Sequence, residues 1–214
     1  MKDSDLHSRV LLVEGTDDMH VVIQLSKREK LPHNFYIIET GGIDKLLDAI
    51  MVEADVADRR VMGIVLDADE RPNSRWQAVT DRLNELRKEE HFDLPELPEQ
   101  PKSTGTIVNG TLRIGIWLMP DNHSSGELED FVAEMIPNTD PLWPLSEQYI
   151  DEIPLNHRRF RSKKSLRAKV HAWLATREQP RPMGQAIGAE DLDISVTNII
   201  TFIDWLRELF KEEL

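Results

Sequence analysis

The sequence of 214 residues contains no cysteine and no long hydrophobic run. The lack of cysteine excludes disulfides and thiolate metal sites, and it is typical of proteins from a reducing compartment. No apolar run approaches the ~18 residues of a membrane-spanning helix, and residues 1–10 lack the apolar stretch of a secretory signal. We therefore expect a globular protein located in the cytoplasm, without a membrane partner.

The motifs of several common enzyme classes are also missing. The seven histidines show no H-x-H or H-x-x-x-H spacing, which argues against a zinc site. No G-x-x-x-x-G-K-[ST] loop is present, so we expect no nucleotide binding of that kind. The absence of a G-x-S-x-G motif disfavours an α/β-hydrolase.

The charge of the chain is strongly acidic but unevenly distributed. The net charge of -13 argues against a general nucleic-acid coat, because phosphate binding depends on lysine and arginine. Residues 157–169 nevertheless carry seven basic side chains and no acid. Two interpretations stay open for this basic segment: a solvated helix start that balances the surface, or a contact with a polyanion or a protein partner.

Three short apolar runs alternate with helical patterns in the first half of the chain. The runs cover residues 10–13, 35–38 and 61–66. Apolar residues at helical spacing follow each run, with the first helix expected to be capped by Thr16 and the third to cover about 74–90. This β-α-β-α-β-α order predicts a parallel sheet with right-handed crossovers.

The following region predicts an antiparallel addition to this sheet. Three prolines indicate that residues 93–103 form a loop. Two strand patterns, 106–108 and 111–119, flank Asn109-Gly110, a pair that favours a tight primed turn. We therefore expect a hairpin at an edge of the sheet.

The rest of the chain has helical patterns. Helices are expected from Gly126 and over about 162–177 and 195–212, with Trp173 and Trp205 as core residues. We expect an α/β domain at residues 1–137 and a helical extension at 138–214 packed on it. The predicted fold class is α/β: a Rossmann-like, mostly parallel sheet flanked by helices, with an edge hairpin and a C-terminal helical extension.

Acidic residues follow two of the predicted strands. Glu14 ends the first apolar run, and Asp67 and Asp69 end the third. In an open parallel sheet of order 2-1-3, these strand ends are neighbours at the point where ligands bind. Clustered carboxylates raise one another's proton affinity unless a cation such as Mg²⁺ or Mn²⁺ offsets them, so a metal site for phosphoryl chemistry is one interpretation. The alternative is that these acids only form turns and caps before Pro72.

Two motifs combine at these strand ends: Val13-Glu14-Gly15-x-Asp17 and Leu66-Asp67-Ala68-Asp69. Together they resemble the Toprim domain, over residues 8–120. That family includes topoisomerase metal sites, bacterial primases, small ribosomal-RNA maturases and the nuclease part of the overcoming-lysogenization-defect (OLD) proteins. The resemblance implies a metal pair at Asp67 and Asp69, with Glu14 as a further ligand and as the general acid or base.

The whole sequence also resembles a group of small bacterial proteins known as a domain of unknown function. In that group, the Toprim core is followed by a Met-Pro-Asp loop, an acidic helix and a helical tail with Trp-Leu. The matching segments are Met119-Pro120-Asp121-Asn122, Gly126-Glu127-Leu128-Glu129-Asp130 and Asp204-Trp205-Leu206.

These resemblances extend the candidate site and suggest its activity. Candidates for a second metal, or for residues around the first, are Asp17, Asp121 and Glu129; candidates for nucleic-acid contact are Arg161, Lys163 and Lys164. The leading hypothesis is a Mg²⁺- or Mn²⁺-dependent nuclease of the Toprim type, acting on nucleic acid with an ATPase as a candidate partner. The alternative hypothesis is a non-catalytic regulatory module that binds a metal or a phosphorylated ligand and acts through protein contacts.

Overall fold

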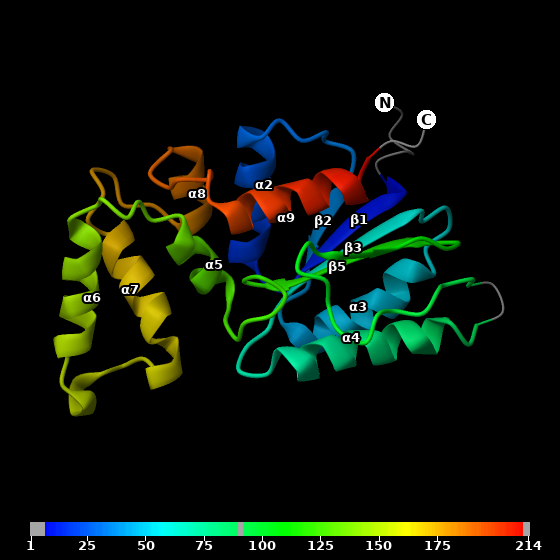
Figure 1. Cartoon of the computed structure of the whole chain (residues 1–214), viewed down its shortest axis with the longest axis horizontal. Helices are drawn as coiled ribbons and strands as arrows, with labels where there is room; N and C mark the ends of the chain where they lie inside the picture. Colours follow the sequence, from blue (N-terminus) through cyan, green and yellow to red (C-terminus); the bar gives the residue numbers. More distant parts are fainter. Residues whose placement is uncertain (1–6, 90–91, 212–214) are drawn as a thin grey trace.

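The computed structural model describes residues 7–89 and 92–211, and in these residues five strands form one sheet. The strand order is β2-β1-β3-β5-β4, and Figure 1 shows the sheet between layers of helices. The strands are β1 (Arg9–Val13), β2 (Tyr36–Glu39), β3 (Val61–Asp67), β4 (Thr106–Val108) and β5 (Arg113–Met119). The predicted mixed α/β fold is confirmed.

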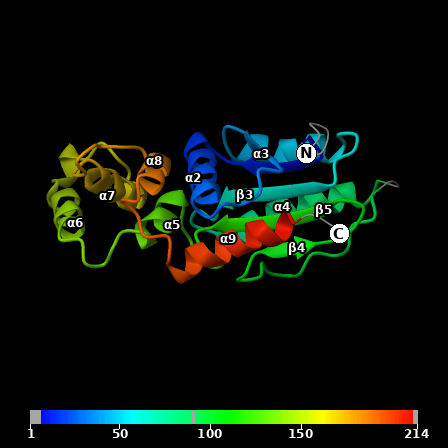
Figure 2. The ribbon, with the colours of Figure 1, turned by 90° about the horizontal axis from the view of Figure 1, so that it is seen from above.

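The parallel part of the sheet has the predicted 2-1-3 order. β1 pairs in parallel with both β2 and β3, and β3 pairs in parallel with β5. Because Val13 is opposite Val65 in the register, β1 and β3 end near each other at the same edge. Glu14 and Asp67 therefore lie at the same end of the sheet. Figure 2 shows that this end points toward α5 (Leu128–Glu134).

Alternating side chains of the strands form two cores. Val10 and Leu12 of β1 pack with α3 (Ile43–Ala54) and α4 (Pro72–Leu86) on one face. Leu11 and Val13 face α2 (Thr16–Arg28) and α9 (Thr197–Leu209) on the other face. Figure 1 shows these two helical layers on opposite sides of the sheet. The period of two along the strand thus produces a three-layer core.

Two glycines let α9 lie close to the sheet. Gly63 of β3 is opposite Gly115 of β5 in the register. A Cβ atom at Gly115 would lie 2.5 Å from Leu209 Cδ2, and one at Gly63 would lie 3.0 Å from the same atom. The C-terminal helix is therefore part of the sheet's own core, and Trp205 is buried as predicted.

The predicted hairpin exists, but its turn is wider than expected. β4 and β5 are antiparallel, with Val108 opposite Ile114, so Asn109-Gly110 does not form a two-residue turn. The backbone of Asp93 lies over this loop: Thr111 N–H donates to the Asp93 carbonyl at 3.0 Å, and Thr111 Oγ1 accepts from Asp93 N–H at 3.0 Å. These long-range contacts hold the loop open.

The predicted helix boundaries needed small corrections. Gly15, not Thr16, is the N-cap of α2, because Asp18 accepts a hydrogen bond from the Gly15 N–H. The third helix, α4, begins at Pro72 rather than Ser74, with the proline in the first turn where it needs no N–H partner. It ends at Leu86 rather than at about residue 90, and residue 90 itself lies outside the described residues.

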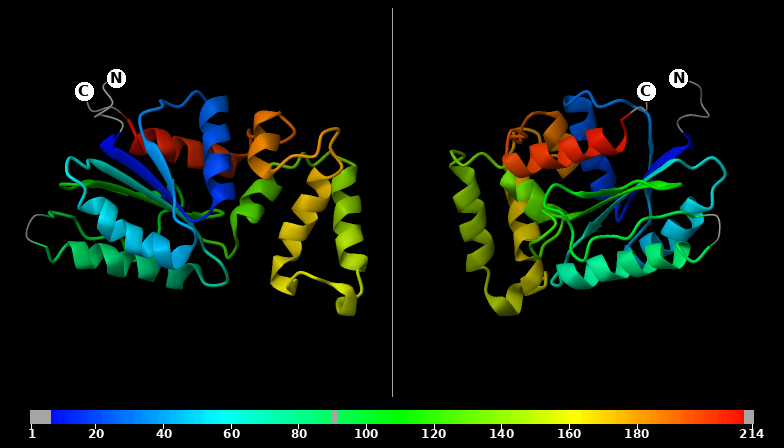
Figure 3. Two further views of the ribbon diagram at one scale, coloured as in Figure 1. Left: turned by 180° about the vertical axis from the view of Figure 1, so that it is seen from behind. Right: turned by 45° about the vertical axis from the view of Figure 1, so that its right-hand side comes forward.

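The helices between α5 and α9 extend away from the sheet. α6 (Leu142–Glu152) and α7 (Ser165–Leu174) lie side by side in both views of Figure 3, and α7 also packs on α5. The short α8 (Met183–Gly188) packs on α2, and Trp173 of α7 is buried as predicted. The division of the chain at residue 137 stays a prediction.

The basic segment 157–169 covers the second part of the connection between α6 and α7 and the first half of α7. The connection contains two short 3₁₀ turns, Leu155–His157 and Ser162–Lys164, so the helix expected at 162 becomes α-helical only at Ser165. In the described part of the chain, no helix has both the length and the apolar character needed to cross a membrane.

Candidate functional site

A chamber of about 430 Å³ lies at the carboxyl edge of the parallel sheet. Residues following β1 and β3 form one side, and the starts of α2, α5 and α7 form the others. The lining is dominated by six acidic side chains with two basic ones. They are Glu14, Asp17, Asp18, Asp67, Glu127 and Glu129, with Lys164 and Arg167.

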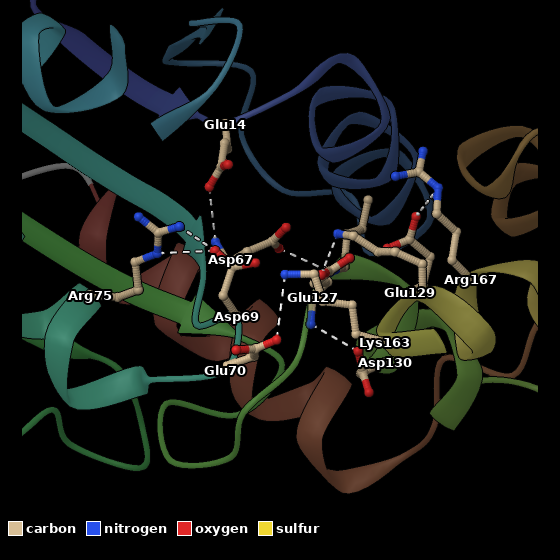
Figure 4. A network of polar contacts seen from close by, with 12 residues as sticks. Glu14, Asp67, Asp69, Glu70, Arg75, Glu127, Glu129, Asp130, Lys163 and Arg167 are labelled. Atoms are coloured by element: carbon tan, nitrogen blue, oxygen red, sulfur yellow. Dashed lines mark hydrogen bonds and ion pairs between the residues drawn. The ribbon is translucent and has the colours of Figure 1, made fainter. Parts of the chain in front are cut away.

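Glu14 and Asp67 meet in this chamber, as the sequence predicted. Glu14 Oε2 accepts a hydrogen bond from the backbone N–H of Asp67 at 3.3 Å. Asp67 Oδ1 accepts from the backbone N–H of Leu128 at 2.9 Å, and Leu128 is the first residue of α5. The positive end of α5 therefore faces the Asp67 carboxylate. Figure 4 shows both side chains directed toward the same space.

Asp18 is a third carboxylate of the chamber, and the sequence analysis did not identify it. Its Oδ2 accepts from Gly15 N–H at 3.1 Å, whereas its Oδ1 is buried without a hydrogen-bond partner. A buried oxygen of this kind costs free energy unless it receives a proton or a cation. The available sequence signal was its position at the third residue of a helix, where an acid folds back toward the N-cap.

Burial and mutual repulsion raise the proton affinity of these three groups. Burial raises the pKa of Asp67 to about 9, with the charges of Asp18 and Glu14 as the next causes. Burial raises the pKa of Asp18 to about 7, and the charge of Glu14 adds to this. The pKa of Glu14 is raised by burial, although the Asp67 N–H and the charge of Arg75 act to lower it. Asp18 and Asp67 thus bind protons near neutral pH, and the pKa of Glu14 is shifted in the same direction.

The acids around this trio are offset by arginine and lysine. Asp69 pairs with Arg75, whose Nε lies 3.1 Å from Asp69 Oδ2. Glu127 pairs with Lys164, and Glu129 pairs with Arg167 at 3.1 Å. Figure 4 shows the Asp69–Arg75 and Glu129–Arg167 pairs on either side of Asp67. The basic segment of the sequence therefore contacts the predicted acidic site.

The backbone turns sharply at Asp69, which corrects one expectation. We expected an extended chain with Asp67 and Asp69 facing the same way, but Asp69 has a φ of 51°. Its N–H donates to the carbonyl of Gly126 at 2.8 Å, and Gly126 N–H donates back at 2.8 Å. Asp69 therefore lies beside the chamber, paired with Arg75, while its charge still raises the pKa of Glu14.

The remaining predicted residues are distributed around the chamber. Asp17 lines it, but its side chain is 42% exposed, at 4.0 Å from Arg167. Asp121 does not line it; this carboxylate accepts from the backbone N–H groups of His123 and Ser124 in a turn. Lys163 pairs with Glu70 at 3.4 Å, and Arg161 is exposed.

The acids next to the trio are paired with arginine or lysine side chains. Over residues 7–89 and 92–211, no three histidine or acidic side chains are placed as a ready-made metal site. The groups that could hold a hard cation are Glu14, Asp18 and Asp67, because they have only oxygen donors, raised pKa values and one unpartnered buried oxygen. The paired acids Asp69 and Glu129 flank them.

The fold and the site define an α/β protein with an acidic chamber at the switch point of a mostly parallel sheet. The chain belongs to the family described as Protein of unknown function (DUF3226), whose model matches residues 8–211. The predicted membership of a family of unknown function is therefore confirmed.

Comparison with curated proteins found no match. Among solved structures, the chain is similar to the C-terminal region of the Xanthomonas campestris pv. campestris OLD protein, with 16% sequence identity. The similarity covers 94% of this chain and 95% of that chain, with a TM-score of 0.45. The geometry of the chamber stands independently of this similarity.

Proposed function

We propose that this protein is a divalent-metal-dependent phosphodiesterase of the Toprim type that cuts nucleic acid. The observation that carries the proposal is the trio of Glu14, Asp18 and Asp67, which are packed together with raised pKa values and one unpartnered buried oxygen. Like charges are not kept in a buried chamber for stability, because each raises the free energy of the others. Such clusters occur at functional sites.

A hard divalent ion, Mg²⁺ or Mn²⁺, fits the donors of the chamber. The trio supplies carboxylate oxygens, the ligands that such ions prefer. A bound ion would polarise a phosphate and activate a water. Asp69 joins Asp67 in the motif that resembles the Toprim metal pair. To bind the ion, Asp69 would have to break its ion pair with Arg75. Asp17, Asp121 and Glu129 stay candidates for a second ion or for positioning.

The chain's own residues have distinct parts in this proposal. Glu14 accepts a hydrogen bond from the Asp67 N–H through Oε2, so its Oε1 is available to take a proton from the attacking water. Its raised pKa brings its proton exchange closer to neutral pH. Lys164 and Arg167 line the same chamber and now pair with Glu127 and Glu129. They can contact a phosphate once other groups neutralise these two carboxylates.

The acidic surface indicates weak intrinsic affinity for nucleic acid, so a partner is part of the proposal. With a net charge of -13, the chain repels a polyanion except at the basic segment. By analogy with the resemblance to OLD proteins, an ATPase is the proposed partner, and it would bring the substrate to the chamber.

A second function is favoured by one observation. Arg75, Lys164 and Arg167 already neutralise Asp69, Glu127 and Glu129. A regulatory module that binds a metal or a phosphorylated ligand without catalysis would use the same chamber and act through protein contacts.

Plasmid nicking with Mn²⁺ separates these two functions. We expect wild-type protein to nick and both Glu14→Gln and Asp67→Asn to lose at least about tenfold in rate, about 1.4 kcal/mol of transition-state stabilisation. The matched control is Asp58→Asn, a surface aspartate at the opposite edge of the sheet whose φ of 67° asparagine also tolerates. Equal nicking by all four preparations would contradict the proposed nuclease function of the chamber. Metal binding without nicking in the wild type would favour the regulatory module.

A further inference from the structure

A second cavity lies next to the acidic chamber, and its charge is of the opposite sign. It has a volume of about 300 Å³ and lies where the chain leaves Asp69 and enters α4. Three cations and two acids line it, together with Ser74 and Ala68. The charged residues are Arg71, Arg75, Lys163, Asp69 and Glu70. This cavity is net positive in a chain of net charge -13, so it is suited to an anion.

The cations of this cavity differ in how firmly they are engaged. Arg75 pairs with Asp69, and Lys163 pairs with Glu70 at 3.4 Å. Arg71 is exposed, and its side chain makes no hydrogen bond or ion pair within the part of the chain that the structure describes. Figure 4 shows Arg75 and Lys163 approaching the Asp69–Glu70 segment from different elements. An incoming anion therefore meets one free guanidinium and two cations that are shared with carboxylates.

The start of α4 adds to the positive field. This helix of 15 residues has Arg71 as its N-cap, no side-chain cap and no acidic residue in its first turn. The start of α2, by contrast, is offset by Asp17 and Asp18. Ser74, in the first turn, places a hydroxyl at the cavity. Backbone dipole and side chains thus favour the same kind of ligand.

We propose that this cavity binds a backbone phosphate of the nucleic acid, next to the phosphate that is attacked in the chamber. The inference rests on the proposed function for its choice of polyanion. Asp69 lies between the two cavities, because it lines this one and also a smaller hollow of about 180 Å³ that shares Glu127 and Arg167 with the chamber. A cation held by the Asp69 carboxylate would leave Arg75 free to contact the phosphate. Substrate binding and metal binding would then support each other at Asp69.

Arg71→Gln is the variant that tests this phosphate pocket. Within residues 7–89 and 92–211 the Arg71 side chain has no partner to lose, so the folded structure and its circular dichroism should not change. Arg60→Gln is the matched control, because Arg60 is also an exposed arginine and precedes β3 at the opposite edge of the sheet. Both variants change the net charge equally. A general electrostatic effect would therefore alter both proteins alike.

The measurement is binding of a fluorescein-labelled DNA duplex by fluorescence anisotropy in Ca²⁺ over a series of salt concentrations. We expect Arg71→Gln to raise Kd about tenfold at low salt and to reduce the slope of log Kd against log salt by about 0.9, one phosphate contact. Arg60→Gln should leave both values near those of the wild type. Nicking with Mn²⁺ is measured on the same preparations.

The outcomes separate the pocket from the activity. If the wild type binds and nicks while Arg71→Gln and Arg60→Gln share one Kd and one slope, the phosphate pocket is wrong and the nuclease stands. If the wild type binds DNA, Arg71→Gln loses one phosphate contact, and the wild type does not nick, the result supports the pocket and contradicts the nuclease. A wild type that nicks but shows no measurable binding even at low salt overturns the pocket and leaves the nuclease standing.

Discussion

Asp18 of α2 faces Asp67 at the end of β3, and after burial it is the strongest cause of the raised pKa of Asp67, about 9. Between the pKa of an unfolded aspartate and this value, the folded protein holds a proton that the unfolded chain has lost. The folded state therefore binds more protons, and its stability falls as the pH rises through that window. Asp18 contributes a loss of stability with rising pH in the same way, because its pKa is raised to about 7.

The first prediction concerns the pH dependence of stability. In EDTA, the free energy of unfolding should fall from about pH 5 to about pH 9, and Asp67→Asn should flatten this dependence. At pH 9, the variant should be more stable than the wild type by at least about 1.4 kcal/mol, the value of one pKa unit. Asparagine keeps an Oδ1 for the Leu128 N–H.

Urea unfolding at several pH values measures this difference. The control is Asp58→Asn at the opposite edge of the sheet, which should follow the wild-type profile. Parallel profiles for Asp67→Asn and the wild type would mean that Asp67 is not protonated in the folded chamber.

The second prediction concerns the ion pair of Glu129 with Arg167. Glu129 is 5% exposed, so Arg167→Gln leaves a buried carboxylate without its cation. We expect a loss of about 1–3 kcal/mol at pH 8, and a smaller loss at pH 5. The pKa of Glu129 is already raised by burial, so a protonated carboxyl then needs no partner.

Chemical unfolding at both pH values checks this, with the double variant Arg167→Gln/Glu129→Gln as the rescue. Arg207→Gln is the control, because in the described part of the chain Arg207 pairs with the more exposed Glu29 and Asp204, and this variant should lose about 0–1 kcal/mol. An Arg167→Gln variant with equal losses at both pH values would show that Glu129 stays charged throughout.

The strand ends of the site were predictable because their arrangement follows from local patterns. Unbroken apolar runs that end in Glu14 and Asp67 indicate parallel strands, and parallel strands end at one edge. The residues of the basic segment were visible as a group, but their partners were not. The contacts of Lys164 with Glu127 and of Arg167 with Glu129 depend on how α7 packs on α5, and no periodicity encodes that packing.

Two other features of the site depended on backbone detail. The turn at Asp69 arises from its paired hydrogen bonds with Gly126, a residue far along the chain, so an extended chain was the simpler expectation. The choice between Asp17 and Asp18 depended on the N-cap. Once the cap is Gly15 rather than Thr16, it is Asp18 that accepts the Gly15 N–H and turns its other oxygen into the protein.

The third prediction concerns the contact between α9 and the sheet. A methyl group at Gly115 would lie 2.5 Å and 2.8 Å from the two Cδ atoms of Leu209, and 3.0 Å from Trp205 Cζ2. Gly115→Ala should therefore lose about 1–3 kcal/mol of stability through overpacking. In the background of Leu209→Ala, the same change should lose at least about 0.5 kcal/mol less, because the clashing atoms are gone. Urea unfolding of the four proteins measures this coupling, and strict additivity would contradict the close contact.

The fourth prediction uses two adjacent aspartates, Asp17 and Asp18, as a matched pair. Both variants, Asp17→Asn and Asp18→Asn, remove one negative charge from the first turn of α2. Only Asp18 is buried, with an unpartnered oxygen beside Glu14 and Asp67, whereas Asp17 is 42% exposed beside Arg167. If the chamber holds a divalent ion, Mn²⁺ should raise the melting temperature of the wild type and of Asp17→Asn, because a ligand of the folded state stabilises it.

Asp18→Asn should lose most of this Mn²⁺-dependent shift, even though its melting temperature in EDTA at pH 8 should equal or exceed that of the wild type. The two effects have one cause, since a carboxylate that is unfavourable when the chamber is empty of cations becomes a ligand when a cation is bound. Differential scanning fluorimetry in EDTA and in Mn²⁺ measures both. An Mn²⁺ shift of equal size in Asp17→Asn and Asp18→Asn would remove Asp18 from the site, because the buried oxygen would then make no difference to the ion.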